Sequence, residues 1–167
     1  MKEQTHTLWH VGRGVGLIFI VVSLILPGCS KPKKPLKCPS GTEHMGSGPP
    51  MGKREYCAKL HKKTGEMRNH GPWRAYWPNG KVESTRVYKK GKEHGRYRGY
   101  NLEGRKILEG RYEKGVKVGT WTAFKRSGDV EKETDYEGGQ KAAIRLFDEE
   151  GNLTEEQIKR NGKWYSR

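Results

Sequence analysis

The sequence predicts an all-β fold, in which a meander of repeated β-hairpins follows a small disulfide-closed module. Three observations point to it. Glycines and aromatic residues recur with a period of 24 residues, turn signals divide the repeats into runs of strand length, and two cysteines precede the first repeat. Only 32% of the residues are apolar, but five Trp, eight Tyr and three Phe distinguish the chain from disordered sequences, which are poor in aromatic residues.

Residues 1–28 are predicted to be a cleaved signal peptide. Lys2 and Arg13 supply a positive start, an apolar run with Gly and Ser extends over residues 15–26, and Leu-Pro-Gly-Cys29 follows at once. This resembles a bacterial lipoprotein signal with its lipobox, which implies that the Cys29 thiol is diacylglycerylated and that the chain is cut after Gly28. A transmembrane anchor is the alternative, but these twelve residues are fewer than the roughly 20 that a spanning helix needs.

Residues 29–37 comprise the lipidated cysteine and a basic tether. Ser30 to Lys37 reads SKPKKPLK, and its two prolines and four lysines cannot pack a core, so a semi-extended linker is expected. Each lysine beside lipid headgroups contributes about 1 kcal/mol if the surface is anionic; a merely soluble linker is the alternative. Because Ser30, and not Asp, follows the cysteine, analogy with enteric bacteria favours the outer membrane, at its periplasmic face or the cell surface, over the inner membrane.

Cys38 and Cys57 are predicted to form a disulfide within a module of residues 38–70. After lipidation of Cys29 they are an even pair in a compartment that permits oxidation. The bridge would close a loop of about 20 residues and contribute roughly 3 kcal/mol by the chain-entropy estimate. The alternative is a metal site that also uses His44 or His61, but it lacks the close C-x-x-C spacing of most zinc sites. No metal and no cofactor is therefore expected.

The repeat domain, residues 71–167, is clearest when it is aligned on its leading glycines. Three units open with Gly71-Pro-Trp-Arg-Ala-Tyr, Gly95-Arg-Tyr-Arg-Gly-Tyr and Gly119-Thr-Trp-Thr-Ala-Phe. A degenerate fourth unit starts near Ala142, which replaces the leading glycine, and Arg145 falls in or beside the slot of the first aromatic residue. One unit cannot bury its aromatic residues alone, whereas stacked neighbours can share them.

Each unit is predicted to form one hairpin. Asn79-Gly80 is a strong signal for a two-residue type I′ turn, because both central residues of that turn need positive φ. Weaker versions of the signal occur at Glu103-Gly104, Ser127-Gly128 and Gly151-Asn152. Four such units predict eight short strands in a single-layer meander. A further glycine follows each signal after eleven residues, at Gly91, Gly115, Gly139 and Gly162.

The recurring aromatic residues are the predicted repeat core. They occupy two positions early in each unit and a tyrosine position seventeen residues into it, so equivalent residues are expected on one face. The set is Trp73, Tyr76, Tyr88, Tyr97, Tyr100, Tyr112, Trp121, Phe124, Tyr136 and Phe147. An aromatic ladder for sugars or lipid headgroups is the alternative for Trp73, Tyr97 and Trp121, although periodic aromatic residues beside periodic glycines favour a core.

The repeat has a known counterpart. The pattern G-x-W-x-x-Y-x-x-x-G-K, followed by Y-x-x-G-x-x-x-G, resembles the MORN repeat in its bacterial variant form. Gly71, Trp73, Tyr76, Gly80 and Lys81 match it closely, and three units in phase make the match specific. The resemblance extends from the first of these glycines to about residue 164. With its lipobox, the chain as a whole resembles a bacterial MORN-variant repeat lipoprotein.

Charge is the best clue to a ligand. The net charge of +15 favours anionic partners such as phosphate-bearing lipid, polyanionic glycan or nucleic acid. The excess is uneven, with 23 Lys and Arg against eight Asp and Glu from Cys29 to Val118, but nine against ten from Gly119 to Arg167. A solvated surface is the alternative, because charge runs usually mean only that. The candidate anion-binding residues are Lys89, Lys90, Arg96, Arg98, Arg105, Lys106 and Arg111.

The sequence predicts binding and no catalysis. It contains no nucleophile elbow, no H-E-x-x-H, no phosphate-cradling G-x-x-x-x-G-K-[ST] and no paired-carboxylate motif, so no catalytic residue is expected. We expect a membrane-anchored envelope lipoprotein that acts as a binding or scaffold module for an anionic lipid, a glycan or a partner protein. The resemblance implies an immunity or antitoxin protein as the alternative, since bacterial MORN-variant proteins are often catalogued among toxin partners. A nucleic-acid binder fits the export signal poorly, so no nucleic-acid partner is expected.

Replacing Cys29 with Ala is expected to abolish acylation, because the thiol is the only acceptor that the lipobox offers. Metabolic labelling with a palmitate analogue measures this directly. The matched control, Cys38→Ala, is expected to keep the label. Equal labelling of wild type and Cys29→Ala would contradict the lipoprotein assignment.

Overall fold

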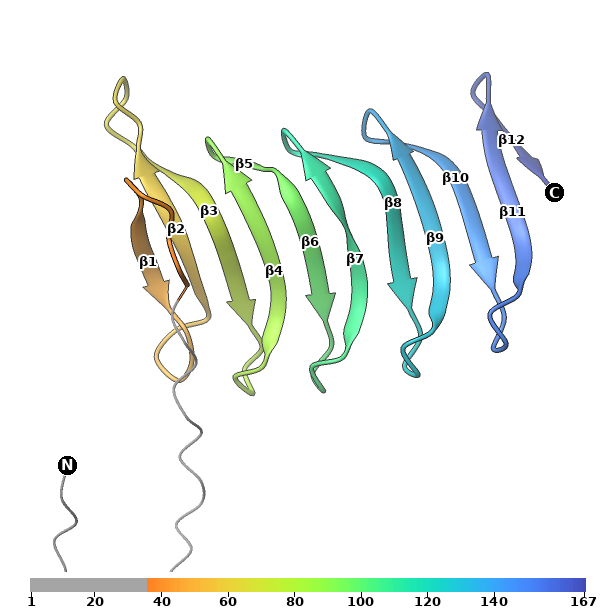
Figure 1. Ribbon diagram of the computed structural model, residues 1–167, viewed down its shortest axis with the longest axis horizontal. Helices are drawn as coiled ribbons and strands as arrows, with labels where there is room; N and C mark the ends of the chain where they lie inside the picture. The colour runs from red at the N-terminus through yellow and green to blue at the C-terminus, as the bar shows by residue number, and fades with distance from the viewer. Residues whose placement is uncertain (1–35) are drawn as a thin grey trace, which may run out of the picture. The chain divides into compact units, whose positions relative to one another are not determined.

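The computed structural model describes residues 36–167, and every regular element in this part of the chain is a β-strand. The predicted lipidation site at Cys29, the signal peptide and most of the tether lie outside it. The strands form one open antiparallel sheet, in which neighbours along the chain are also neighbours in the sheet (Figure 1). The predicted all-β meander is confirmed. Residues 36–167 contain no helix that is long and apolar enough to cross a membrane.

The sheet has twelve strands. The two-residue β5 pairs only with the end of β4, and the main path runs from β4 directly to β6. The bounds are β1 (Glu43–Ser47), β2 (Arg54–Leu60), β3 (Met67–Tyr76), β4 (Val82–Lys89), β5 (Lys92–Glu93), β6 (Gly95–Tyr100), β7 (Lys106–Glu113), β8 (Val116–Phe124), β9 (Val130–Glu137), β10 (Gln140–Phe147), β11 (Leu153–Arg160) and β12 (Lys163–Ser166).

The cysteine-containing segment continues the same sheet. Cys38 and Cys57 form the predicted disulfide, with their Cα atoms 5.5 Å apart. β2 pairs with β3, so that Tyr56 lies opposite Trp73, and β1 pairs with β2. The disulfide therefore ties the residues that precede β1 to a strand whose other neighbour is the first strand of the repeats.

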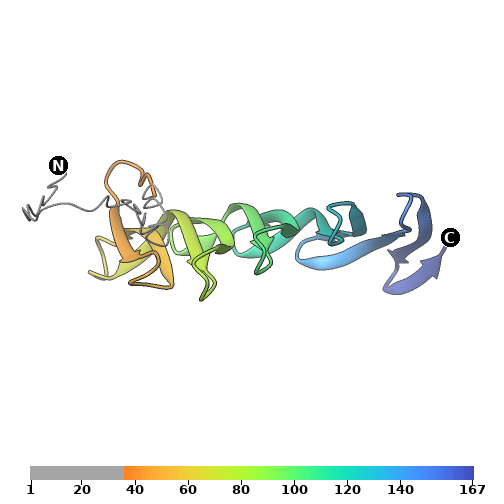
Figure 2. The same ribbon diagram turned by 90° about the horizontal axis from the view of Figure 1, so that it is seen from below.

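The sheet has one layer, so successive residues of each strand point to opposite faces. Figure 2 shows the hairpins in a single row from β1 to β12, with no second sheet against them. Cross-strand pairing assigns the faces. We call the side that carries Trp73, Tyr97 and Trp121 the tryptophan face, and the side that carries Arg98 and Arg145 the arginine face.

Aromatic rings from successive hairpins pack together on the tryptophan face. The ring centroids of Tyr97 and Trp121 lie 5.3 Å apart, and Tyr112 meets Trp121 edge-on at 4.9 Å. Tyr136 lies 6.2 Å from Trp121 on the other side. Gly110 leaves room for this indole, since a Cβ there would lie 2.2 Å from the ring, and Trp121 is only 3% exposed. Such ring pairs contribute about 0.5–1.5 kcal/mol each beyond the area they bury.

An arginine extends this stack to the first repeat. The guanidinium of Arg86 lies 4.8 Å from the ring centroid of Trp73 and 5.4 Å from that of Tyr97. Its Nη1 donates to Glu93 at 3.1 Å. Trp73, Arg86 and Tyr97 thus form a cation–π sandwich between the first two units. Direct ring contacts join the second and third units on this face.

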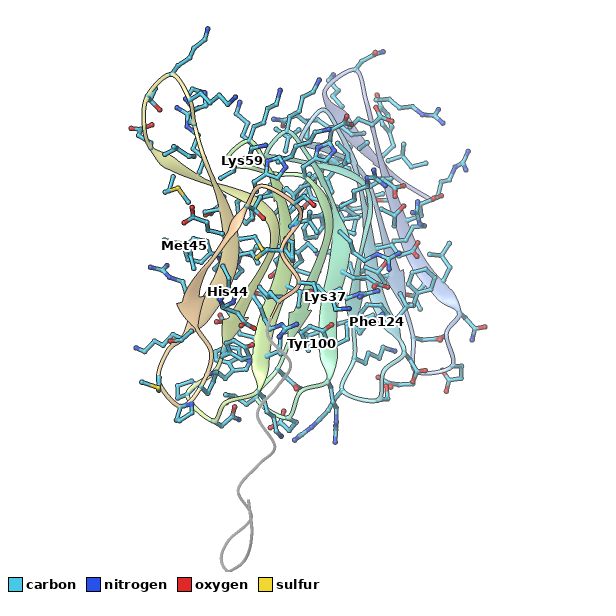
Figure 3. The ribbon with its side chains drawn as sticks, turned by 60° about the vertical axis from the view of Figure 1, so that its left-hand side comes forward. Lys37, His44, Met45, Lys59, Tyr100 and Phe124 are labelled. Carbon is cyan, nitrogen blue, oxygen red and sulfur yellow. A yellow bond between two sulfur atoms is a disulfide. The ribbon has the colours of Figure 1, made fainter. Side chains whose placement is uncertain are left out.

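The second aromatic residue of each unit lies on the arginine face, at the end of the first strand of its hairpin. A register shift accompanies each one, and such β-bulges increase the local twist of a strand. Figure 3 labels two of these residues, Tyr100 and Phe124, which lie on successive hairpins. The four are Tyr76, Tyr100, Phe124 and Phe147.

The predicted turns lie in the loops between strands, but the predicted turn type is wrong. The Asn79-Gly80 loop is a type I turn followed by a left-handed glycine: Gly80 N–H donates to the Trp77 carbonyl at 2.9 Å, and Gly80 has φ +78° whereas Asn79 does not have positive φ. The predicted turns at Glu103-Gly104, Ser127-Gly128 and Gly151-Asn152 likewise have positive φ only at the glycine. Pro78 suits the first central position of a type I turn, but the other three loops have the same hydrogen bond without a proline, so the geometry belongs to the repeat.

The two-residue turns lie at the other ends of the strands, away from the loops just described. Both central residues have positive φ at Lys90-Gly91, Lys114-Gly115, Gly138-Gly139 and Asn161-Gly162. The glycines that follow each predicted turn signal after eleven residues therefore supply the type I′ turns. The left-handed conformation costs an L-residue roughly 1–2 kcal/mol, so Lys90 and Lys114 adopt it because the turn requires it.

Side chains in the lower turns of Figure 1, which join the two long strands of each repeat hairpin, hydrogen-bond the backbone of the next lower turn. Trp77 Nε1 donates to the Tyr100 carbonyl at 3.0 Å, and Lys81 Nζ donates to the Glu103 carbonyl at 3.1 Å. One hairpin further, Arg105 Nη1 donates to the carbonyl of Arg126 at 3.2 Å, and Lys125 Nζ then donates to the carbonyl of Asp148. Each lower turn thereby satisfies carbonyl groups of its successor.

The degenerate fourth unit is one residue shorter than the third at the irregular start of its first strand, since four residues separate Lys117 from Thr122 in β8 and three separate Lys141 from Arg145 in β10. The register shifts between Lys141 and Ala143, so Arg145 lies opposite Glu133 on the arginine face and does not occupy the place of Trp121. Arg145 forms a bidentate pair with Asp135 at 2.9 and 3.0 Å, and its Nε donates to Glu133 at 3.1 Å. The aromatic stack of the tryptophan face therefore does not continue into β10.

Replacing Gly110 with Ala is expected to lower the free energy of unfolding by about 1–3 kcal/mol, the usual cost of overpacking, because the new methyl overlaps the indole of Trp121. Urea denaturation measures it. In a Trp121→Leu background the obstruction is gone, so Gly110→Ala should cost much less there. An equal cost in both backgrounds would show that the glycine is needed for another reason.

Candidate functional site

The seven basic residues singled out from the sequence do not form one site. Lys89 and Lys90 lie at the turn after β4, whereas Arg105 lies in the lower turn before β7, where its guanidinium binds a carbonyl of the next turn. The structure brings the other four together on β6 and β7. These are Arg96, Arg98, Lys106 and Arg111, and we call them the arginine patch.

Two arginines of the patch face each other. Arg96 and Arg111 are direct cross-strand partners on the arginine face, and both are exposed. Like charges directly opposite each other destabilise a sheet. Within residues 36–167 neither guanidinium makes an ion pair. The patch therefore holds two adjacent positive charges that form no ion pair with a carboxylate in the described part of the protein.

One carboxylate serves the other two cations. Glu109 accepts a hydrogen bond from Lys106 Nζ at 2.9 Å and lies 3.7 Å from Arg98 Nε. The hydrogen bond from Lys106 lowers the pKa of Glu109 below its usual value, and the positive charges of Lys106, Arg98 and Arg96 lower it further, against a smaller opposing effect of burial. Glu109 is therefore surrounded by basic side chains, and its carboxylate pairs with two of them.

Other arginines on the same face are engaged in pairs. Arg74 donates to Glu55 at 2.8 Å, and this carboxylate, 5% exposed, also accepts from the Tyr76 hydroxyl. Arg145 is held by two carboxylates, and its hydrogen bonds lower the pKa of Asp135 below the ordinary value. These ion pairs lie on both sides of the arginine patch. The lack of an ion pair at Arg96 and Arg111 is therefore a local feature of the sheet.

The predicted repeat-core residues are all buried or half-buried. Trp121 and Tyr76 are 3% and 5% exposed, and the other eight are half-buried. The indole of Trp121 is covered by three tyrosine rings and by the ammonium of Lys117, which lies 4.1 Å from its centroid. It has no open face on which a sugar could stack.

Three lysines that the sequence analysis did not single out lie together on the tryptophan face. Lys117, Lys132 and Lys141 come from β8, β9 and β10 and line one hollow. The 24-residue spacing between Lys117 and Lys141 was the one available signal. Lys132 joins them only through the register that pairs it with Ala123.

Among the residues that the structure describes, no three His, Cys, Asp or Glu side chains are arranged to hold a metal ion. His44, considered above as a possible metal ligand, instead places its Nε2 3.3 Å from a carboxylate oxygen of Glu55. Cys38 and Cys57 are consumed by the disulfide.

Comparison with known proteins gives few matches. No protein-family model and no curated protein matches the chain. Among solved structures, a mutant of S. aureus TarM in complex with fondaparinux, alpha-GlcNAc-glycerol and UDP is similar at 11% identity and a TM-score of 0.42 over 75% of this chain. A second crystal structure of TarM is similar at 10% identity and a TM-score of 0.36. The chain spans 21% of the length of either TarM chain.

Replacing Arg111 with Glu is expected to raise the free energy of unfolding by up to about 1 kcal/mol, because it turns a like-charge cross-strand pair into an opposite-charge pair with Arg96. Thermal denaturation at low salt is the measurement. Arg111→Gln, which removes the repulsion without adding an attraction, should give a smaller increase. A decrease in both variants would mean that the arginine makes a stabilising contact of its own.

Proposed function

We propose that this protein is a membrane-anchored envelope lipoprotein that acts as a non-enzymatic binding module, and that the arginine patch is the surface that meets an anionic envelope component. The lipobox at Cys29 and the basic tether support the anchoring. The observation that carries the binding role is that Arg96 and Arg111 lie opposite each other on neighbouring strands and form no ion pair with the described residues. Their mutual repulsion is relieved when a ligand supplies the counter-charge.

The chemistry of the patch suits phosphate or carboxylate groups. Each guanidinium presents a planar fork that binds two oxygens at once, and it is more weakly hydrated than an ammonium. An array of anionic groups, as on a lipid surface or an acidic glycan, would engage both arginines together. A partner protein that presents carboxylates offers the same chemistry.

The tether keeps this surface near the membrane. Eight residues separate Cys29 from Cys38. At no more than about 3.6 Å per residue, they allow the sheet to move at most about 30 Å from the anchor. A ligand that is itself part of the envelope, or attached to it, lies within that distance.

The test is capture of anionic material by the lipidated protein reconstituted in neutral phosphatidylcholine vesicles. Phosphatidylglycerol vesicles and acidic envelope glycan are added separately, and co-sedimentation is measured. Arg96→Glu/Arg111→Glu should reduce capture at least tenfold and make the remainder less dependent on salt. This variant keeps like charges opposite each other, so its stability should stay close to that of wild type.

The matched control is Lys159→Glu/Lys163→Glu, which makes the same change in net charge at exposed positions of β11 and β12. It should retain most of the capture. An equal loss in the two variants would show that capture depends on the net charge of the chain and not on the proposed site. Unchanged capture by Arg96→Glu/Arg111→Glu would exclude the patch.

A further inference from the structure

The tryptophan face carries a hollow that the proposed function does not use. It lies over β7, β8, β9 and β10, on the face opposite the arginine patch, and has a volume of about 190 Å³. Three lysines surround a wall of aromatic and aliphatic side chains. The lining residues are Leu108, Lys117, Trp121, Ala123, Lys132, Thr134, Tyr136 and Lys141.

The hollow is positively charged throughout. No carboxylate lines it, and its three lysines make no ion pair within residues 36–167. By register, the nearest carboxylates on this face are Glu155, two strands from Lys132, and Glu93 on β5. Both are engaged, the first by the amide of Gln157 at 2.6 Å and the second by Arg86.

One of the three charges is held in place. The ammonium of Lys117 lies 4.1 Å from the ring centroid of Trp121 and 5.1 Å from that of Tyr136. Because Trp121 is buried among three tyrosines, the rings under Lys117 are fixed. Less side-chain entropy is then lost when a ligand binds this ammonium.

A threonine hydroxyl also lines the hollow. Thr134 makes no side-chain hydrogen bond with the described part of the chain. Among the described residues Arg86 Nε is the one buried side-chain polar atom without a partner, so the Thr134 oxygen is accessible to solvent. This hydroxyl can therefore donate a hydrogen bond to a ligand oxygen in the hollow.

We propose that this hollow binds a phosphate monoester. Three ammonium groups and one hydroxyl supply more donors than a carboxylate can use, whereas a phosphate monoester carries a charge of about −1.5 to −2 and three acceptor oxygens. Leu108, Ala123 and the ring of Tyr136 also line the hollow, and the carbon skeleton that bears the phosphate would pack against them. Pockets for whole ligands are roughly 300–1,000 Å³, so a hollow of this size takes the phosphorylated end of a larger molecule.

Isothermal titration calorimetry of the full chain in nonionic detergent tests the proposal. The probes are glucose 6-phosphate against glucose, and phosphatidic acid against diacylglycerol in mixed micelles. At least one ester should bind saturably at one site, where its neutral counterpart does not. The ester that binds more tightly identifies the source of the phosphate, a soluble sugar ester or a lipid headgroup. If neither ester binds better than its neutral counterpart, the proposal is wrong.

Three variants tie such binding to the hollow. Lys132→Gln/Lys141→Gln should weaken it at least tenfold, since each hydrogen bond to a charged group contributes about tenfold or more. Thr134→Val, which keeps the side-chain shape, should weaken it several-fold with an unchanged melting temperature. The charge-matched control Lys159→Gln/Lys163→Gln, at exposed positions of β11 and β12 outside the hollow, should leave it within twofold. An equal loss in that control, or full binding by the lysine variant, would overturn the proposal.

Discussion

The structure depends on one constraint, which is that a single-layer sheet has no second layer against which to bury its large side chains. Each hairpin must cover the rings of its neighbour, and the repeat length decides which rings meet. Trp121 shows how closely this is adjusted, because the absence of a side chain at Gly110 is what lets the indole lie flat among three tyrosines. The small hydrophobic content of the chain is sufficient for this kind of packing, since neighbouring hairpins share the same rings.

The same packing determines which charges remain available. Arg86 is built into the ring stack, Arg74 is buried against Glu55, and Arg145 is held by two carboxylates. The guanidinium groups of these three arginines are engaged by other side chains of the sheet. Arg96 and Arg111 have no such partner among the described residues, although they lie on strands between those that carry the engaged ones. A count of basic residues along the sequence could not separate the two groups, because pairing depends on cross-strand register.

Periodic features of the sequence were sufficient to predict the fold, since glycine and aromatic spacing reports the hairpin repeat and the cysteine pair reports the disulfide. Features that depend on a one-residue shift were not predictable. The Asn79-Gly80 loop was assigned the wrong turn type because the Asn-Gly pair occupies the last two positions of a longer loop. Arg145 was expected in or beside the aromatic slot, and only the cross-strand register shows that it lies beside it. The lysines of the hollow share no sequence segment, and only strand pairing brings Lys132 between the other two.

The hydrogen bonds between lower turns all point the same way along the chain. Trp77 and Lys81 donate forward to the second turn, Arg105 donates forward to the third, and Lys125 to the fourth. An inner turn is thus an acceptor for the hairpin before it and a donor for the hairpin after it. A whole unit of 24 residues can be lost or duplicated without leaving either role unfilled, whereas a deletion of part of a unit breaks both. The sheet is therefore able to evolve in length by complete hairpins, each bringing its own share of surface charge.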